Sequence, residues 1–288
     1  MNASIVIPVA REGADLYERI RALTLELGSL EACKGLSFDI ILVSDVFDSP
    51  TLKSMMRLSR QGLARAYFLT RRVGKGGSVK NVIGLTKGEV TVVLDADIPV
   101  SPRIICRSVR VVANGGLDLL LANRVYRSHS IVRRLLSLTY NALVNVLFRT
   151  GLRDHQAGFK VFKTSTARVI LALLTRTDGL AYDTEAIVWT RRRKARYKTV
   201  DVSWIERRPN STISTLKALI AISMDLAALR LITLGSKYRA LVRVRAGKII
   251  DLSNVHVLGS SYMTIIRGSG AKKKLLSLLV RFYIALTK

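Results

Sequence analysis

Short apolar segments alternate with helical segments through the first 122 residues, and this alternation restricts the possible folds more than any other feature. Five segments have the length and composition of buried strands: 3–9, 38–43, 64–69, 91–94 and 117–122. Segments with apolar residues at helical spacing lie between them. Strands joined by such crossovers lie parallel in one sheet. The sequence therefore predicts an α/β fold with a mostly parallel central sheet and helices on both of its faces.

The sequence after residue 122 is less regular, and it suggests a second, smaller part of the chain. We assign residues 1–234 to one α/β domain and residues 235–288 to a β-rich appendage. The predicted elements of the first domain's second half are a helix over 128–148, a polar loop over 154–160, a helix near 164–174, a strand over 198–204 and a long apolar helix over 214–234. Those of the appendage are a hairpin (240–245 and 248–252), strands at 255–258 and 262–266, and a basic amphipathic helix over 271–288.

The charge of the chain restricts its partners. Lys and Arg total 47 and Asp and Glu total 20, so the formal net charge is +27. Such a charge favours nucleic acid, anionic lipid headgroups or phosphorylated substrates. No nucleic-acid-binding motif accompanies the charge, and aromatic residues make up only 6% of the chain, so we expect no nucleic acid partner. The lysines at the start of the 271–288 helix favour an anionic membrane surface, although a core helix is the alternative.

Two further features concern the surroundings of the protein. Cys33 and Cys106 lack metal-like spacing, so we expect buried free thiols in a reducing compartment. The N-terminus has no signal-peptide pattern. The uncharged apolar run Leu135–Phe148 is shorter than the ~20 residues that span a bilayer. We therefore expect no transmembrane helix and a peripheral attachment to the membrane.

Two carboxylates follow the predicted strand 91–94, namely Asp95 and Asp97. Open α/β sheets bind ligands at the carboxyl ends of their strands. Because residues i and i+2 of an extended chain point the same way, both side chains could face one cation. Carboxylate oxygens suit Mg²⁺ or Mn²⁺, and these ions usually bind together with substrate phosphates. The alternative is a turn in which both side chains cap backbone groups.

A basic glycine-rich loop over 71–77 precedes a predicted helix. It is not a P-loop, because no Gly-Lys-Ser/Thr follows at the required spacing. It is not a dinucleotide-binding G-x-G-x-x-G either, because Val79 stands in the place of the third glycine and the loop follows the third strand. A helix N-terminus favours anions, so we expect this loop to lie near phosphate groups.

Several short motifs occur in one order along the chain, and the ordered set is more specific than any one of them. The motifs are Val6-Ile7-Pro8 with Glu12, Thr51, Gly74-Lys75-Gly76-Gly77 with Gly84, Asp95-Ala96-Asp97, Asn123-Arg124, Asp154-x-Gln156-x-Gly158-Phe159-Lys160, Tyr182-Asp183-x-Glu185 and Val202-x-Trp204. Over residues 3–234 this set resembles the family 2 glycosyltransferases of the polyprenyl-phosphate branch, that is, dolichol-phosphate mannosyltransferase and dolichyl-phosphate glucosyltransferase. The glycine loop and the motif from residue 154 to 160 look closer to the glucosyltransferases.

The resemblance implies a fold and an activity. The fold would be GT-A, the α/β fold that binds nucleotide-diphospho-sugars. The activity would be inverting, metal-dependent transfer of one hexose from UDP-glucose or GDP-mannose to dolichyl or polyprenyl phosphate at the cytoplasmic face of a membrane. The cofactor would be Mg²⁺ or Mn²⁺.

The resemblance also implies roles for particular residues on the donor side. The residues that would hold the nucleotide sugar are Pro8, Glu12, Asp45, Lys75, Asp95, Ala96 and Asp97. Of these, Asp95 and Asp97 would also bind the metal and act in catalysis. Two departures from the family pattern affect this set. Ser44 stands where many relatives have an acid near the base, and Pro99 stands where mannosyltransferases often have a glutamine near the metal.

On the acceptor side, four residues match the family positions that contact the acceptor phosphate: Arg124, Arg133, Ser137 and Arg207. Asp154 would be a catalytic acid that faces the acceptor, with capping of its own loop as the alternative. Asp183 and Glu185 have either a role in the site or only the role of acids at a helix N-terminus. We assign no role to the three histidines.

The chemistry of a phosphate acceptor is consistent with these residue types. A phosphate monoester is already anionic near neutral pH, so it needs no strong base before it attacks the anomeric carbon. It needs cations that bring two anionic substrates together. Two alternatives stay open at this point: a family 2 transferase that uses a soluble or glycan acceptor, and an inactive basic protein that binds membranes or nucleic acid.

Overall fold

The computed structural model describes residues 1–126, 131–175 and 181–204, and short pieces of the chain beyond them (223, 225–230, 233, 249–251, 255–258 and 262–265). Within these residues, eight strands form one mixed sheet in the order β7-β5-β6-β4-β1-β2-β3-β8. The strands are β1 Asn2–Val9, β2 Ser37–Ser44, β3 Arg65–Leu69, β4 Val90–Leu94, β5 Leu119–Tyr126, β6 Phe159–Lys163, β7 Tyr197–Ser203 and β8 Ile249–Asp251. Strands β9 (Val255–Leu258) and β10 (Tyr262–Ile265) form a separate antiparallel pair.

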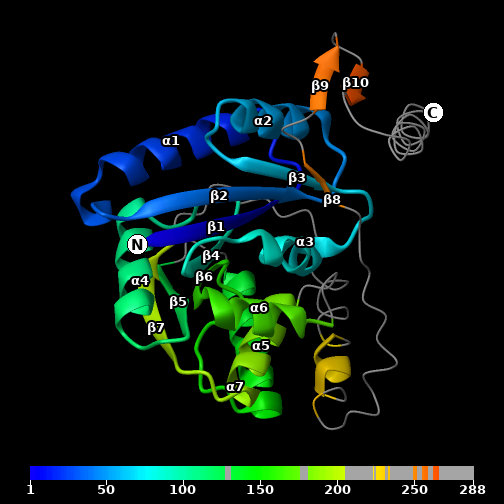
Figure 1. Ribbon diagram of the computed structural model, residues 1–288. Helices are drawn as coiled ribbons and strands as arrows, with labels where there is room; N and C mark the ends of the chain where they lie inside the picture. Colours follow the sequence, from blue (N-terminus) through cyan, green and yellow to red (C-terminus); the bar gives the residue numbers. More distant parts are fainter. Residues whose placement is uncertain are drawn as a thin grey trace, which may run out of the picture.

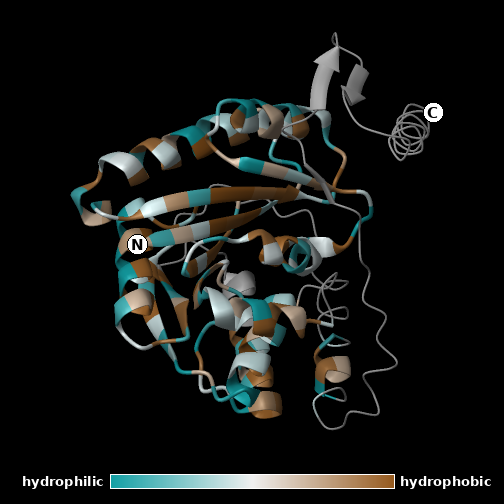
Figure 2. Ribbon diagram, viewed as in Figure 1, coloured by the Kyte–Doolittle hydropathy of each residue, from teal (hydrophilic) through white to brown (hydrophobic). Residues whose placement is uncertain are grey.

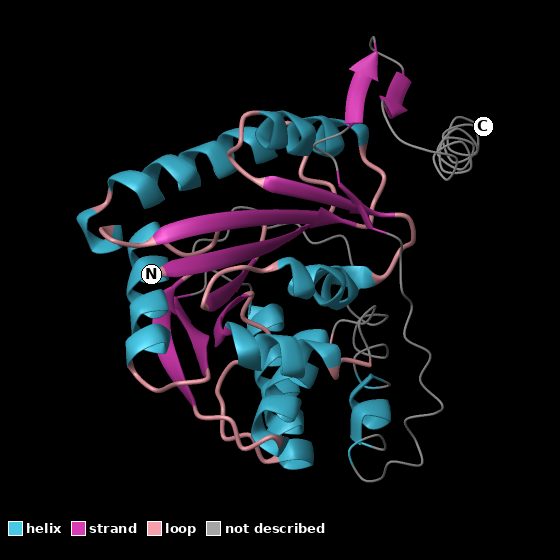
Figure 3. Cartoon of the chain, viewed as in Figure 1, coloured by secondary structure: helices cyan, strands magenta, loops and turns pink. Residues whose placement is uncertain are grey.

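Helices cover both faces of the sheet (Figures 1 and 3). They are α1 Asp15–Ser29, α2 Ser49–Arg60, α3 Gly74–Val82, α4 Pro102–Asn114, α5 Ile131–Phe148, α6 Thr164–Ala172 and α7 Tyr182–Arg192. Side chains of α1, α2 and α4 form one buried cluster with the sheet, and those of α3, α6 and α7 form a second. Along β1, Ile5 and Ile7 belong to the first cluster and Val6 to the second, so the strand is apolar on both faces. The apolar strands between the two helical layers are visible in Figure 2.

The predicted parallel sheet is confirmed. Strand β1 lies between β2 and β4 and is parallel to both, β3 is parallel to β2, and β7 is parallel to β5. Two strands run the other way: β6 is antiparallel to β4 and β5, and β8 is antiparallel to β3. Pairing of β8 with β3 adds a short piece of the predicted appendage to the edge of the main sheet.

Strand β6 corrects the sequence analysis, which assigned Phe159 and Lys160 to a polar loop. The lysine suggested exposure to solvent, yet only 3% of Lys160 is accessible. Its ammonium forms an ion pair with Asp183, which the local sequence around Lys160 cannot reveal. The strand is therefore a central one, buried between β4 and β5.

The start of α2 connects two loops that carry predicted site residues. Asp48 caps the helix by accepting a hydrogen bond from the backbone N–H of Thr51 at 3.1 Å. The Thr51 hydroxyl in turn accepts a hydrogen bond from Gly13 N at 2.8 Å. Gly13 has a φ of +68°, a conformation that glycine adopts without strain. These contacts hold the loop after β1, which contains Glu12.

Several predicted elements lie partly or wholly outside the described residues. Of the predicted helix over 214–234, the structure describes residues 223, 225–230 and 233 as helical. The strand over 240–245, the helix over 271–288 and Arg207 lie outside the described residues, and the boundary at residue 234 stays a prediction. In the part of the chain that is described, no helix has both the length and the hydropathy needed to cross a bilayer.

The predicted free thiols are wrong. Cys33 and Cys106 are buried, as expected, but they form a disulfide with a Cα–Cα distance of 5.2 Å. Cys33 ends the short 3₁₀ turn Glu31–Cys33 and Cys106 lies on α4, 73 residues later. Spacing along the chain could not reveal this pairing, because packing of α4 against the turn brings the two residues together.

We predict that reduction of this disulfide lowers the free energy of unfolding by about 4 kcal/mol, because the bond closes a long loop in the unfolded chain. The measurement is urea unfolding with and without a reductant. The double variant Cys33→Ala/Cys106→Ala is the control, because its midpoint should not respond to the reductant. An identical midpoint for the oxidised and the reduced wild-type protein would contradict the prediction.

Candidate active site

A pocket of about 320 Å³ lies at the carboxyl ends of β1, β2 and β4. Seven of its eleven lining residues are those predicted to hold a nucleotide sugar: Pro8, Glu12, Asp45, Lys75, Asp95, Ala96 and Asp97. The other four are Val9, Ala10, Arg72 and Ser78. The fold therefore brings the whole predicted donor set to one pocket, and the role of each residue stays a prediction.

Asp95 and Asp97 lie in a turn that directly follows β4. The N–H of Ile98 donates to the carbonyl oxygen of Asp95 at 3.0 Å, which closes this turn. The extended geometry from which we argued that both carboxylates face one way is thus wrong, although both still line the same pocket. Ile98 has a φ of 49°, which is rare for a β-branched residue and is often found at functional sites.

The two carboxylates of this turn are partly buried, and their negative charges repel each other. Burial, and then the charge of Asp95, raise the pKa of Asp97 to about 6. Burial disfavours the charged form of Lys75, but Asp183 and Asp95 outweigh this effect and hold the pKa of Lys75 well above its usual value. The site therefore stabilises positive charge beside this turn.

The donor set fits a divalent cation that is bound together with a diphosphate. Among the described residues, no three His, Cys, Asp or Glu side chains gather into a metal site. Asp95 and Asp97 offer two hard carboxylate ligands, and phosphate oxygens and water can supply the others. The raised pKa of Asp97 supports the fit, because a bound cation would supply the nearby positive charge that stabilises the ionised carboxylate.

Two glycines permit the close packing around the turn. A Cβ at Gly158 would overlap the Asp95 carboxylate, and the Gly158 carbonyl accepts a hydrogen bond from Asp95 N at 3.0 Å. A Cβ at Gly76 would lie 2.6 Å from the Tyr182 ring. Glycine is needed at both positions because another chain segment fills the space of the side chain.

Asp45 fastens the glycine-rich loop to the end of β2. Its carboxylate accepts hydrogen bonds from Val73 N at 2.8 Å and from Gly74 N at 2.6 Å, and it pairs with Arg72 at 3.0 Å. Ser44, the departure from the family pattern, is buried, and its hydroxyl accepts from Val46 N at 3.2 Å. Asp45 therefore shapes the wall of the pocket through the loop that it holds.

On the acceptor side, Arg124 and Asp154 form a bidentate ion pair. The guanidinium nitrogens Nε and Nη2 lie 2.6 and 2.9 Å from the two carboxylate oxygens. Asp154 is buried and also accepts a hydrogen bond from Gln156 N at 3.2 Å, so the loop-capping alternative describes its contacts. Arg124 also lies against the Trp204 ring, at 5.2 Å from its centroid.

The other acceptor-side predictions are described only in part. Arg133 and Ser137 lie on α5, four residues apart and therefore on one side of the helix. Ser137 is half-buried, and its carbonyl accepts a hydrogen bond from Asn141 at 2.7 Å. The structure thus places the backbone of these residues without testing their roles.

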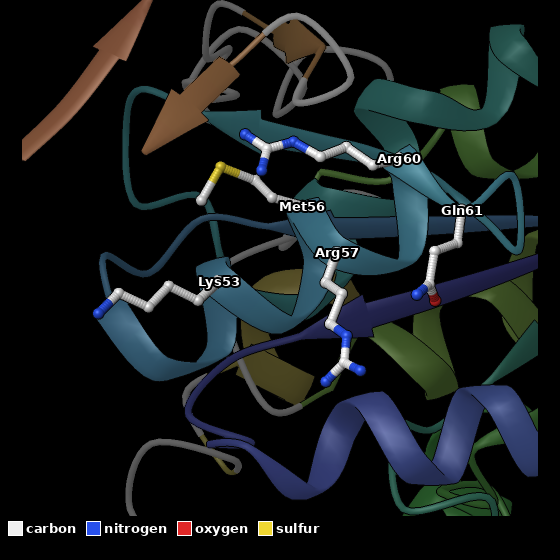
Figure 4. Close-up of a pocket in the computed structure, with 5 residues that line it drawn as sticks. All are labelled: Lys53, Met56, Arg57, Arg60 and Gln61. Carbon is white, nitrogen blue, oxygen red and sulfur yellow. The ribbon is translucent and has the colours of Figure 1, made fainter. Parts of the chain in front are cut away.

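A second hollow of about 400 Å³ lies on α2 and is lined by Lys53, Met56, Arg57, Arg60 and Gln61 (Figure 4). Arg57 stacks on Tyr17 of α1 at 3.8 Å from the ring centroid, and the Tyr17 hydroxyl donates to Gln61 at 2.8 Å. None of the predicted site residues lines this hollow, and it has no carboxylate for a metal. The smaller pocket, at the carboxyl ends of β1, β2 and β4, is therefore the candidate active site.

Comparison with known families decides the class of the chain. The family model described as Glycosyl transferase family 2 matches residues 4–172, which is more than half of the chain. The chain belongs to glycosyl transferase family 2. The predicted family is therefore confirmed.

Individual relatives of this family 2 transferase are distant. A glycosyltransferase of Haloferax volcanii is 26% identical over 209 residues, which cover 71% of this chain and 33% of the relative. A dolichyl-phosphate beta-glucosyltransferase of Dictyostelium discoideum is 25% identical over 208 residues, which cover 67% of this chain and 63% of the relative. Both matches span less than two thirds of the relative's length.

A solved structure confirms the predicted GT-A fold. Glucosyl-3-phosphoglycerate synthase from Mycobacterium tuberculosis, in complex with Mn²⁺, UDP and glucosyl-3-phosphoglycerate, superposes with a TM-score of 0.55 at 16% identity. The match covers 84% of this chain and 81% of the synthase. At this identity the likeness concerns the fold of the transferase alone.

Three buried residues have contacts that the sequence analysis missed. His155 lies between Asn141 and Thr150, with both ring nitrogens at 2.6 Å from side-chain oxygens, and burial lowers its pKa to about 4. Glu185 is buried and accepts hydrogen bonds from Thr175 N and from the Trp189 indole. Asp183 instead contacts Lys75, which lines the pocket, and Lys160. The sequence carried no signal for these contacts, because the burial of Lys160 is visible only in the structure.

We predict that Gly158→Ala lowers transferase activity by about 100-fold, because the added methyl group displaces the Asp95 carboxylate from its position. Activity and thermal melting are measured on the same samples. Gly84→Ala is the matched control, because no atom lies within 4 Å of its added Cβ. Equal activities of the two alanine variants would show that Asp95 tolerates the shift.

Proposed function

We propose that this family 2 glycosyltransferase is a dolichyl-phosphate hexosyltransferase. It transfers glucose or mannose from UDP-glucose or GDP-mannose to dolichyl or polyprenyl phosphate, with inversion and with Mg²⁺ or Mn²⁺. The observation that carries the proposal is a pocket lined by two carboxylates of the type that binds Mg²⁺ or Mn²⁺, in a protein whose helix α5 exposes an apolar surface to solvent. The name of the Dictyostelium discoideum relative supports the same acceptor class.

The donor side of the proposal uses the residues that line the pocket. Asp95 and Asp97 would hold the cation, and Lys75 with the N-terminus of α3 would face the diphosphate. Pro8, Glu12 and Asp45 would contact the base and the ribose. When bound, a divalent cation neutralises the charge that develops on the leaving diphosphate.

The acceptor side needs cations more than it needs a base. The acceptor phosphate oxygen forms a bond to the anomeric carbon while the bond to the diphosphate breaks on the opposite face, which inverts the configuration. Both oxygens of Asp154 accept hydrogen bonds from Arg124, which supports a role of Asp154 in holding this arginine in place. Arg124, with Arg133, Ser137 and Arg207, would bind the acceptor phosphate.

The surface of α5 supports a lipid acceptor. Leu138, Leu143 and Val146 are 59%, 38% and 77% exposed, so this helix presents a row of large apolar side chains to solvent. The opposite side of α5 holds the loop of Asp154, because Asn141 accepts a hydrogen bond from His155 N at 3.2 Å. A lipid tail on the exposed face would lie along the same helix that carries Arg133 and Ser137, two of the residues proposed for its phosphate.

Basic residues at the end of α5 and α7 favour an anionic membrane. Arg149 is exposed at the end of α5, and Arg191 and Arg192 are exposed on the last turn of α7. The two α7 arginines and Phe148 of α5 line one shallow hollow. Apolar side chains flanked by arginines suit the interface of a bilayer with anionic headgroups. We infer a peripheral attachment at the cytoplasmic face, to which the 271–288 helix would add.

The proposed activity is tested by a donor panel. The purified protein is incubated with UDP-glucose, GDP-mannose and other nucleotide sugars, with Mg²⁺ or Mn²⁺, and with either dolichyl phosphate or a soluble phosphorylated acceptor. We expect one hexosyl-lipid product, and Asp97→Asn should reduce its formation at least ~100-fold with unchanged melting. The exposed Asp15→Asn serves as the matched control. A preference for the soluble acceptor would support the alternative of a family 2 transferase that uses a soluble or glycan acceptor. Absence of product with every donor would support the alternative of an inactive protein that binds membranes or nucleic acid.

A second prediction concerns membrane attachment. Val146→Asp should weaken binding to vesicles that contain anionic lipid by about 10-fold, because it replaces an apolar contact with a repelled charge. Val169→Asp is the control: Val169 is 49% exposed on α6, away from the row on α5. Sedimentation with vesicles measures both variants. Equal binding of the two variants would exclude the α5 face as the contact surface.

A further inference from the structure

Lys75 lies between two carboxylates, one from the turn after β4 and one from the start of α7. Its ammonium nitrogen is 2.6 Å from Asp95 Oδ1 and 3.6 Å from Asp183 Oδ2. Asp183 is itself ion-paired with the buried ammonium of Lys160. Four motifs that are distant in the sequence thus meet in one row of alternating charges. In this row the shorter contact of Lys75 is with Asp95, a carboxylate that we propose as a metal ligand.

We propose that Lys75 is a tethered cation that neutralises Asp95 until the divalent ion binds, and that it then moves to Asp183. The inference rests on the proposed function, in which Asp95 is a metal ligand. It adds to that function a second position for Lys75 and a positioning role for Asp183 and Lys160.

The first step of the argument is competition for one oxygen. A divalent cation of this size binds carboxylate oxygen at roughly 2.0–2.2 Å. An ammonium nitrogen at 2.6 Å from the same oxygen occupies the space and the charge that the ion needs. Lys75 and the ion therefore compete for Asp95 Oδ1, and binding of the ion at this oxygen favours movement of Lys75.

The second step is that a place for Lys75 already exists. Asp183 Oδ2 lies 3.6 Å from the Lys75 nitrogen, only slightly beyond the usual hydrogen-bond limit of about 3.2 Å. Asp183 stays in position because Lys160, with 3% of its side chain accessible, holds its other oxygen. The Tyr182 ring lies 5.2 Å from the Lys75 nitrogen and provides a cation–π surface along the way. The long, flexible side chain of lysine suits such a movement, and 36% of it is accessible.

The third step is the balance of charge. With Asp97, which lines the same pocket, three carboxylates (Asp95, Asp97 and Asp183) accompany two ammonium groups (Lys75 and Lys160), so these five groups carry one net negative charge before the ion binds. A divalent ion changes this to one net positive charge, which attracts a diphosphate. Lys75 thus makes binding of the ion alone less favourable and, once the ion is bound, helps to offset the negative charge of the diphosphate.

The test measures binding of Mn²⁺ alone, without a nucleotide, by electron paramagnetic resonance of the free ion. We expect Lys75→Met to bind Mn²⁺ about 3- to 10-fold more tightly than the wild type, because the competing cation is gone. Lys75→Arg, which keeps the charge, should stay near the wild type. Lys53→Met should also leave the affinity unchanged, because Lys53 lies on α2 outside the pocket (Figure 4). Melting temperatures establish that each variant is folded.

A structure of the wild-type protein with Mn²⁺ provides a second measurement that needs no variant. We expect the Lys75 nitrogen to have left Asp95 and to lie within hydrogen-bond distance of Asp183. Folded Lys75→Met with unchanged or weaker Mn²⁺ affinity, or Lys75 still on Asp95 beside a bound ion, would overturn the inference. Asp97→Asn separates the two failures: equal Mn²⁺ binding by this variant and the wild type would instead refute the metal site of the proposed function.

Discussion

The antiparallel position of β6 beside β4 is the constraint on which the rest of the active site depends. Leu94 pairs with Phe159, so the residue before β6 lies opposite the residue after β4. Gly158 is at that place, and its missing side chain leaves room for the Asp95 carboxylate. Two residues further along, Lys160 meets Asp183 at the start of α7. One strand thus sets the relative positions of the metal-type turn and of the acid that faces it.

The buried charges around this strand matter more to the fold than the many exposed ones. Exposed pairs such as Lys34–Glu31 contribute about 0–1 kcal/mol each. Removal of one partner from a buried pair costs about 3–5 kcal/mol, because a desolvated charge remains. Lys160 and Asp183 have 3% and 7% of their side chains accessible, so they belong to the second class. Burial of the Lys160–Asp183 pair costs desolvation energy. Because Asp183 also contacts Lys75 beside the pocket, the pair is consistent with a role in the active site.

The two sides of the site are built differently. The proposed donor side consists of turns at the ends of β1, β2 and β4, and its loops are held by backbone N–H groups that donate to Asp45 and Thr51. The proposed acceptor side depends on α5, whose inner face contacts His155 and whose outer face is apolar and exposed. This division suits a soluble donor that enters a polar pocket and an acceptor that remains partly in a lipid phase.

The sequence by itself determined the order of the elements up to residue 122, the family, and seven of the eleven residues that line the pocket. Periodicity is local, so the strands of the parallel sheet and the helices between them could be read from a few residues each. The ends of parallel strands share one edge of a sheet, so residues from three motifs could be expected together, as the pocket around Asp45, Lys75 and Asp97 shows. Only the tertiary structure decided which charges are partners. The disulfide of Cys33 with Cys106, the burial of Lys160 and the contact of Lys75 with both Asp95 and Asp183 join residues that are distant in sequence. Such pairs depend on the strand order and on the packing of helices against the sheet, and no local pattern of residues encodes either.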